Sequence, residues 1–326
     1  MPPDRINEHC AWIRSVLALL ALTNMFLFAA ACQPAISQNA KVQTQPDQKM
    51  LFRSDVAPIP TEKRKIIEES IRKFREANPQ ERQPGSVTIP VYFHILTSAD
   101  GKEGNVSCET VQRQMEVLNR AFAGKDPAGP GAATPFKFVF SGMDITPNDK
   151  WFNMAFNENH PSLEEQAAKR ELNRGAKSTL NIYTVKLATK LYGWTRWPWD
   201  YGDGVDGVVI RYTTLPGGEL HFDEGDTATH EVGHWLGLFH TFEGGCDPPG
   251  DSVDDTPPQA VATINCFTTP VHTCSGSDYD QVENFMNYIW DRCMYRFTPG
   301  QSNRMDAVHL LYRTEPKLEI SRGSGR

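Results

Sequence analysis

Concentrated positive charge is what this sequence lacks most clearly. Its 33 lysines and arginines are outnumbered by 40 aspartates and glutamates, which gives a net charge of −7, and no basic run stands out beyond Lys63-Arg64-Lys65. Proteins that bind nucleic acid usually present a basic face, so the composition argues against such a partner. Internal repeats are also absent. The 326 residues, 39 % of them apolar, are enough for one sizeable domain with an N-terminal extension.

The apolar run near the N-terminus is short. It spans residues 16–31, follows two arginines and ends in small residues, which is typical of a secretory signal. A transmembrane helix is the alternative, but the run is short for a span and no basic stop-transfer cluster follows it. Ala29-Ala30-Ala31-Cys32 resembles a bacterial lipobox with Ala in the usual Leu position, so either Cys32 carries a lipid anchor or ordinary signal cleavage occurs. With residues 1–32 as signal or lipobox segment, we expect an extracytoplasmic protein, secreted or membrane-anchored as a bacterial lipoprotein.

Cysteine is sparse before the last third of the chain. Between Cys32 and residue 246 only Cys108 occurs, whereas four cysteines cluster further on, at Cys246, Cys266, Cys274 and Cys293. In an exported protein this cluster predicts two disulfides that staple loop-rich structure, and spacing alone permits three pairings. Cys108 is left over and can be a buried small apolar residue.

Strand and helix patterns alternate up to residue 240 and become irregular afterwards. Residues 33–60 are polar and carry several prolines, which predicts a linker. The alternation predicts a mixed sheet with helices in the upper half and a loop-rich lower half. An aromatic, glycine-rich loop is expected at 192–204. Regular elements are expected at 61–77, 87–96, 107–122, 136–145, 162–172, 180–187, 205–212 and 299–312.

The strongest chemical signal is the segment HEVGHWLGLFH, from His230 to His240. Histidines at i and i+4, His230 and His234, lie on one face of a helix, so both imidazoles can bind one metal ion. Gly237 can adopt a left-handed backbone, which would end the helix and bring in His240 as a third ligand. Three such ligands are typical of a catalytic zinc site with one open position. Glu231 is placed to act as general base, then general acid, on a zinc-activated water.

An amphipathic helix with chance histidines is the competing interpretation. The chain has nine histidines, and three of them fall at the ligand spacing. A lone His-Glu-x-x-His would be moderate evidence, whereas the extended form is specific. Outside residues 1–32, five further histidines lack ligand spacing and are expected to be structural or exposed; among them, His221 lies closest to the helix.

The extended pattern resembles the signature of the metzincin clan of zinc peptidases. That clan also has a Met-turn beneath the metal, and the segment NFMNY at 284–288 resembles it, with Met286 as the methionine. The resemblance implies that Tyr288 stabilises the oxyanion of the reaction. An ordinary buried tyrosine is the alternative.

The match narrows to the pappalysin family. The metal segment is followed by GDSVDDTP at 250–257, and matching segments occur at 89–94, 206–209, 293–294 and 297–305. The family implies a zinc-dependent endopeptidase acting on extracellular proteins or peptides. The family's fold is α+β, that of a two-subdomain, metzincin-like zinc peptidase. A mixed twisted sheet and helices lie above the cleft, and the irregular lower half is stapled by disulfides and ends in a helix. The expected boundaries are 33–84 for linker and pro-segment and 85–326 for the catalytic domain, with subdomains of about 85–240 and 241–315.

The resemblance also implies disulfides and a second metal. The pairings would be Cys246–Cys274 and Cys266–Cys293. A structural calcium ion is expected in the acidic loop, because carboxylates and carbonyls suit Ca²⁺. Its ligands would be Asp251, Asp255 and Thr256; a solvated acidic turn is the alternative.

Latency is where the sequence departs from the family. Pro-segments there often block the zinc with a cysteine, and none lies between Cys32 and Cys108. Asp55 stands at the corresponding place and is a possible latency switch, because a carboxylate can also bind zinc. Substrate preference stays open, since Asp291 and Arg292 could tune the expected specificity pocket in opposite directions.

Two functions compete with the endopeptidase. A catalytically silent surface-binding module could retain the fold, although the complete ligand set and Glu231 argue against it. A zinc hydrolase acting on a non-peptide bond is compatible with the helix alone, and the Met-turn makes it less favoured. The sequence does not reveal the oligomeric state.

Overall fold

The computed structural model describes residues 52–187, 191–200, 204–218, 221–266, 269–276 and 278–314. The expected signal segment and Cys32 lie outside these residues. Within the described ranges, no helix is long and apolar enough to cross a bilayer.

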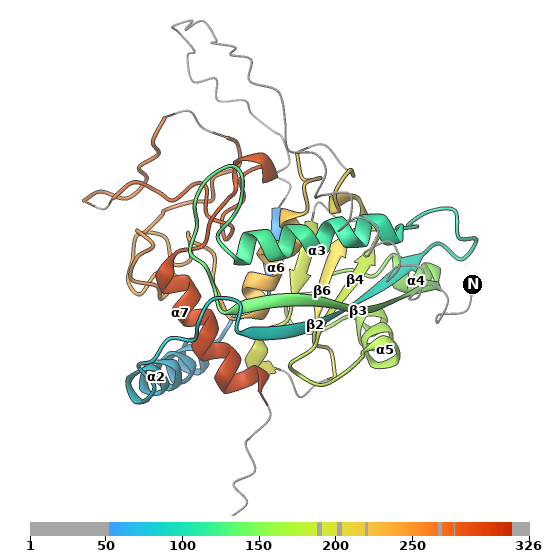
Figure 1. Cartoon of the computed structure of the whole chain (residues 1–326), viewed down its shortest axis with the longest axis horizontal. Coiled ribbons are helices and arrows are strands. Elements are labelled where there is room, and N and C mark those ends of the chain that lie inside the picture. The colour runs from blue at the N-terminus through green and yellow to red at the C-terminus, as the bar shows by residue number, and fades with distance from the viewer. Residues whose placement is uncertain are drawn as a thin grey trace, which may run out of the picture.

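A six-stranded sheet forms the centre of the molecule (Figure 1). Its order is β1-β5-β6-β4-β2-β3. Strand β5 runs antiparallel to β6, and every other neighbouring pair is parallel. The expected mixed sheet is therefore confirmed. The strands are β1 (Phe52–Val56), β2 (Val87–Thr97), β3 (Phe136–Pro147), β4 (Leu180–Val185), β5 (Leu191–Thr195) and β6 (Val208–Arg211).

Helices cover both faces of the sheet, because successive side chains of the central strands point to opposite sides. In β4, Ile182 packs into one apolar cluster and Tyr183 into another. Helices α3 (Cys108–Phe122) and α6 (Asp226–Trp235) contribute to the first cluster, and Figure 1 shows α3 running across the sheet. Helices α4 (Asp149–Phe152) and α5 (Leu163–Leu172) contribute to the second.

The lower half is irregular, as expected. After α6 the described chain has only the short 3-10 turn η3 (Asp291–Cys293) before the last helix, α7 (Pro299–Val308), which continues as a π-helical turn η4 (His309–Arg313). Helix α2 (Thr61–Ala77) lies beside α7 (Figure 1). Two further 3-10 turns are η1 (Pro198–Asp200) and η2 (Tyr212–Thr214).

Two expectations from the sequence are wrong in detail. Residues 52–56, placed in the linker, form β1, and the start of the expected aromatic loop forms β5. The two strands pair with each other, Ser54 opposite Gly193 and Asp55 opposite Trp194. Their hydrogen bonds come from segments far apart in the sequence, so local composition carried no signal for either strand.

One helix start also differs from its sequence pattern. The hydroxyl of Ser162 accepts a hydrogen bond from the Glu165 amide, as a capping box requires. The Glu165 carboxylate instead points into the core, where it binds Lys169 at 2.9 Å and Arg196 at 2.6 Å. Two buried cations therefore outweigh the local capping contact.

Candidate active site

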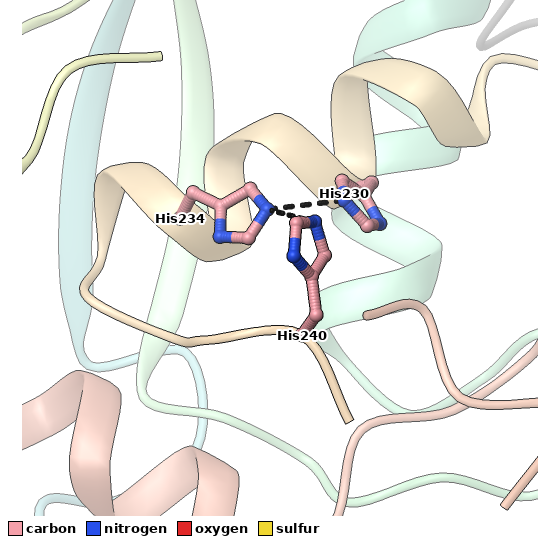
Figure 2. Close-up of side chains that lie close together, drawn as sticks. All are labelled: His230, His234 and His240. Atoms are coloured by element: carbon pink, nitrogen blue, oxygen red, sulfur yellow. Dashed lines mark hydrogen bonds between the residues drawn. The ribbon is translucent and has the colours of Figure 1, made fainter. Parts of the chain in front are cut away.

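Three histidines converge at the C-terminal end of α6. Figure 2 shows His230 and His234 on the helix, with His240 approaching from the segment beyond it. The Nε2 atom of His234 lies 3.1 Å from that of His230 and 3.0 Å from that of His240. The potential ligand atoms of all three lie within 4.8 Å of one another, and no other group of three or more His, Cys, Asp or Glu side chains is so arranged in the described ranges.

Gly237 makes the approach of His240 possible. Its φ of 86° is left-handed, which costs glycine little. Its amide donates to the His234 carbonyl at 2.8 Å, and the next amide, of Leu238, donates to Gly233 at 3.0 Å. These bonds close α6 and reverse the chain, as the sequence predicted.

Backbone carbonyls orient two of the rings. The Nδ1 atom of His230 lies 2.6 Å from the carbonyl oxygen of Phe285, and that of His234 lies 2.7 Å from that of Leu238. A ring that donates Nδ1–H to a carbonyl presents a bare Nε2 lone pair to a metal. Both rings therefore present the correct nitrogen to the centre of the cluster.

Burial keeps His234 and His240 in the form that binds metal. His230 and His234 are fully buried and His240 is nearly so. Burial lowers the pKa of His234 to about 4, and burial with the nearby His234 lowers the pKa of His240 well below its usual value. Neutral imidazoles at neutral pH fit a divalent transition metal, and three nitrogen donors fit zinc.

Glu231 lies between the metal helix and strand β5. It is fully buried, and a Cβ added at Gly193 would come within 2.9 Å of its Oε1 atom. Gly193 therefore leaves the room that this carboxylate needs. The sequence identified Glu231 from its place beside His230; the role of Gly193 appears only in the structure.

The Met-turn lies directly beneath α6. Met286 is fully buried, and a Cβ added at Gly233 would meet its sulfur at 2.4 Å. The turn is held by Asn284, whose side-chain oxygen accepts a hydrogen bond from the Met286 amide at 2.9 Å. The glycine between the first two ligands thus permits close contact of the helix with the methionine.

Tyr288 stands beside two of the histidines. Its ring centre lies 4.9 Å from that of His240 and 5.9 Å from that of His230. The tyrosine is half-buried, so one part of the side chain can reach solvent. This placement is compatible with the role implied by the resemblance.

Asp291 holds the other end of the metal helix. Its Oδ2 atom accepts hydrogen bonds from the backbone amides of Glu224, Gly225 and Asp226 at 3.0, 3.1 and 3.2 Å. A carboxylate at a helix N-terminus satisfies amides that lack a helical partner and interacts well with the helix dipole. Asp291 is 1 % exposed; the sequence allowed it a part in tuning substrate preference, and the structure shows it as the acceptor for these three amides. Arg292 lies over the Trp290 ring.

A buried amide joins the third ligand to the Met-turn. Gln259 is fully buried, and its Oε1 accepts hydrogen bonds from Thr241 at 2.9 Å and Asn287 at 3.2 Å. Thr241 directly follows His240, and Asn287 directly follows Met286. Sequence reasoning missed Gln259, because it lies in an irregular segment without periodicity.

The structure gives the expected calcium site no support. Asp251 accepts hydrogen bonds from the Thr256 hydroxyl at 2.8 Å and the Val253 amide at 3.1 Å. Asp255 instead accepts hydrogen bonds from Thr298 at 2.6 Å and the Gly300 amide at 2.8 Å, at the start of α7. The two carboxylates serve different local structures, and burial raises the pKa of Asp251 to about 7.

The cysteines of the lower half form two disulfides. Cys246 is joined to Cys274, and Cys266 to Cys293, which is the pairing implied by the resemblance. Cys108 is also disulfide-bonded, so it is not the free apolar residue that the sequence allowed.

Comparison with known proteins places this site in a family. A sequence profile described as "Pregnancy-associated plasma protein-A" matches residues 185–309. An extracellular metalloprotease of Sordaria macrospora is 36 % identical over 244 residues, which cover 72 % of this chain and 78 % of that protein. One of Verticillium alfalfae is 38 % identical over 240 residues, covering 70 % and 78 %.

Solved structures agree with the sequence relatives. A promirolysin mutant of Tannerella forsythia superposes with a TM-score of 0.64 at 26 % identity, covering 78 % of this chain and 90 % of that one. Mature mirolysin in complex with a cleaved peptide gives a TM-score of 0.59 at 26 % identity, covering 72 % and 100 %. With relatives this similar over most of its length, the chain belongs to the pappalysin family of metzincin metalloproteases.

Proposed function

We propose that this protein is a zinc-dependent endopeptidase that cleaves extracellular proteins or peptides. The observation that carries the proposal is the convergence of three buried histidine Nε2 atoms beside a buried glutamate. His230, His234 and His240 would hold the ion. When bound, zinc polarises the scissile carbonyl and acidifies an attacking water.

The chain's own residues supply the proton transfers and orientation. Glu231 would accept a proton from the attacking water and deliver it to the leaving amine as the peptide bond breaks. Tyr288 would donate a hydrogen bond to the oxyanion that develops on the carbonyl oxygen. The Phe285 and Leu238 carbonyls would keep the His230 and His234 rings in their binding orientation.

The test combines metal analysis with a proteolysis assay. The purified protein, freed of any inhibiting pro-segment, should contain zinc and cleave casein or members of a peptide library, and a chelator should abolish cleavage. Glu231→Gln should keep the zinc and lose cleavage by at least about 10²-fold, the scale of a lost general base. Glu103→Gln, at a surface ion pair with Lys186, is the control and should cleave normally. Bound zinc with no chelator-sensitive cleavage would favour the silent binding module instead.

We further propose that residues 52–56 keep the precursor latent, with Asp55 as the switch. Two observations support this: β1 pairs with β5, and Gly193 of β5, opposite Ser54, closely approaches Glu231. Asp55→Ala should give an uncleaved precursor that already hydrolyses peptides, whereas Ser54→Ala should leave it latent. An Asp55→Ala precursor as inactive as the parent would remove Asp55 from this role.

Export is proposed on the N-terminal pattern and on the relatives, which are named extracellular metalloproteases. Mass spectrometry of the mature N-terminus tests lipid anchoring at Cys32. A lipidated Cys32 is the expected result for an anchored protein, and a free, unmodified terminus would rule the anchor out.

A further inference from the structure

Helix α2 packs on the catalytic half as a core element does. Its Ile67 and Ile71 are buried, at 5 % and 3 % exposure, in one cluster with Ala307 and Val308 of α7. A segment expected to belong to the pro-segment therefore supplies apolar surface to the lower half.

An ion pair links α2 to a buried arginine of α7. Both terminal nitrogens of Arg304 lie 2.7 Å from the Glu68 carboxylate, and its Nε donates to the Gly237 carbonyl at 2.9 Å. Arg304 is 2 % exposed. Loss of Glu68 would leave a buried guanidinium without its carboxylate, which is strongly unfavourable.

A second arginine, Arg64 of α2, reaches the segment that carries the third ligand. Its guanidinium lies 4.3 Å from the ring centre of Phe239, and that of Arg304 lies 4.9 Å from the same ring. Arg64 also donates to the Gly250 carbonyl at 2.6 Å and lies 3.4 Å from the Glu243 carboxylate. Phe239 is 3 % exposed, so these contacts are largely removed from water.

Phe239 immediately precedes His240, the one ligand that α6 does not carry. Two guanidinium groups fix the Phe239 ring, one from α2 directly and one held by α2 through Glu68. The Phe239 ring also packs against Trp197, at 5.1 Å, and Trp197 packs against His234, at 5.6 Å. The position of His240 relative to α6 thus depends on contacts made by α2.

We propose that Arg64 is a positioning residue for His240, acting through Phe239, and that α2 is a permanent part of the catalytic unit. This inference rests on the proposed zinc-peptidase function. It separates the N-terminal region into a removable part that includes β1 and a retained part that begins with α2. The end of the pro-segment then lies before Thr61 instead of at residue 84.

The rate of zinc release to a competing chelator tests the positioning role without requiring activity. In the zinc-loaded full chain, Arg64→Ala should release zinc about tenfold faster, the scale of a desolvated cation–π contact. Arg64→Lys should restore only part of the difference, because an ammonium lacks the planar fork of a guanidinium. Arg72→Ala is the matched control: Arg72 is on the same helix, 55 % exposed, and pairs only with Glu69 and Glu76 of α2 among the described contacts.

Cobalt substitution adds a spectroscopic reading. The visible bands of bound Co²⁺ should shift in Arg64→Ala and not in Arg72→Ala, since they report ligand geometry. Glu68→Gln perturbs the Phe239 ring through Arg304, so it should also release zinc faster and shift the Co²⁺ bands. Equal zinc release from Arg64→Ala and Arg72→Ala would overturn the positioning role. An unmodified protein that binds no zinc would instead contradict the proposed function itself.

The intact mass of the active protein tests the retention of α2. An N-terminus at or before Thr61 is the expected result. A fully active chain that begins after Ala77 would overturn the retained role of the helix.

Discussion

Gly233→Ala should destabilise the protein although it places a better helix former in a helix. Replacing glycine by alanine inside a helix normally stabilises it by about 1 kcal/mol. Here the new Cβ would lie 2.4 Å from the sulfur of Met286 and 3.3 Å from its methyl carbon. Ordinary contacts between such atoms are about 3.5–4.0 Å, so the overlap exceeds 1 Å at the sulfur.

The methionine has little room to yield. Met286 is fully buried, and Leu238 lies 3.6 Å from the same added Cβ. Overpacking of a filled core costs about 1–3 kcal/mol, which exceeds the gain in helix propensity in most of that range. We expect a net loss of about 1 kcal/mol in the free energy of unfolding. Zinc should also be released faster, because His230 and His234 flank the displaced position.

Urea denaturation of the metal-free protein measures the effect, and a double-mutant cycle isolates its cause. Met286→Ala alone should cost about 2–5 kcal/mol by creating a cavity. In that background Gly233→Ala should become stabilising, by up to about 1 kcal/mol, since its Cβ now meets empty space. A Gly233→Ala protein more stable than the parent, or a cycle with no coupling between the two positions, would refute the steric reasoning.

Three further substitutions probe the supports of the site. Burial raises the pKa of Asp251 to about 7 in the folded state from a usual 3.8, so the carboxyl is protonated when folded and ionised when unfolded between these values. Unfolding then releases a proton, so the stability of the folded protein falls as pH rises from about 4 to about 7. Asp251→Asn should remove this pH dependence and be more stable than the parent at pH 8. Urea midpoints measured over a pH series would show this advantage or disprove it. Asp291→Ala should lower the free energy of unfolding by about 1–2 kcal/mol, because three backbone amides at the start of α6 lose their acceptor. An unchanged urea midpoint would show that Asp291 does not cap the helix. Gln259→Ala should lower the free energy of unfolding by about 1–3 kcal/mol, because it leaves buried hydrogen-bond partners unsatisfied, and it should speed zinc release. The control Asn119→Ala removes hydrogen bonds to β3 far from the metal and should lower stability without changing zinc release.

The three-histidine cluster was predictable because its geometry is local. His230 and His234 share a helix face by spacing, and Gly237 ends that helix within the same eleven-residue segment. Ser107 behaves likewise: its hydroxyl caps α3 by accepting from the Thr110 amide, as its position predicts.

The supports of the site were not predictable, because they come from distant segments. Asp291 caps a helix that begins 65 residues earlier in the chain, and Gln259 joins Thr241 to a turn 28 residues beyond itself. Neither contact leaves a periodic trace in the sequence. The same holds for β1, whose partner strand lies more than a hundred residues away.

A local rule also failed where burial dominates. Glu165 fits a capping box by spacing, yet it pairs with Lys169 and Arg196 in the core. The residue type suited the cap, and the tertiary partners decided the outcome. Calcium binding at Asp251 and Asp255 stays a prediction, since their carboxylates accept hydrogen bonds from two different backbone amides, of Val253 and Gly300.

Anomalous diffraction at the zinc absorption edge, from crystals of the purified protein, tests the three-histidine site most directly. One peak should appear at the centre of the Nε2 atoms of His230, His234 and His240, about 2.0–2.1 Å from each. His240→Ala should weaken or abolish the peak. No zinc peak among these three rings in the unsubstituted protein, or one held by a different set of side chains, would contradict the assignment of this chain as a zinc peptidase.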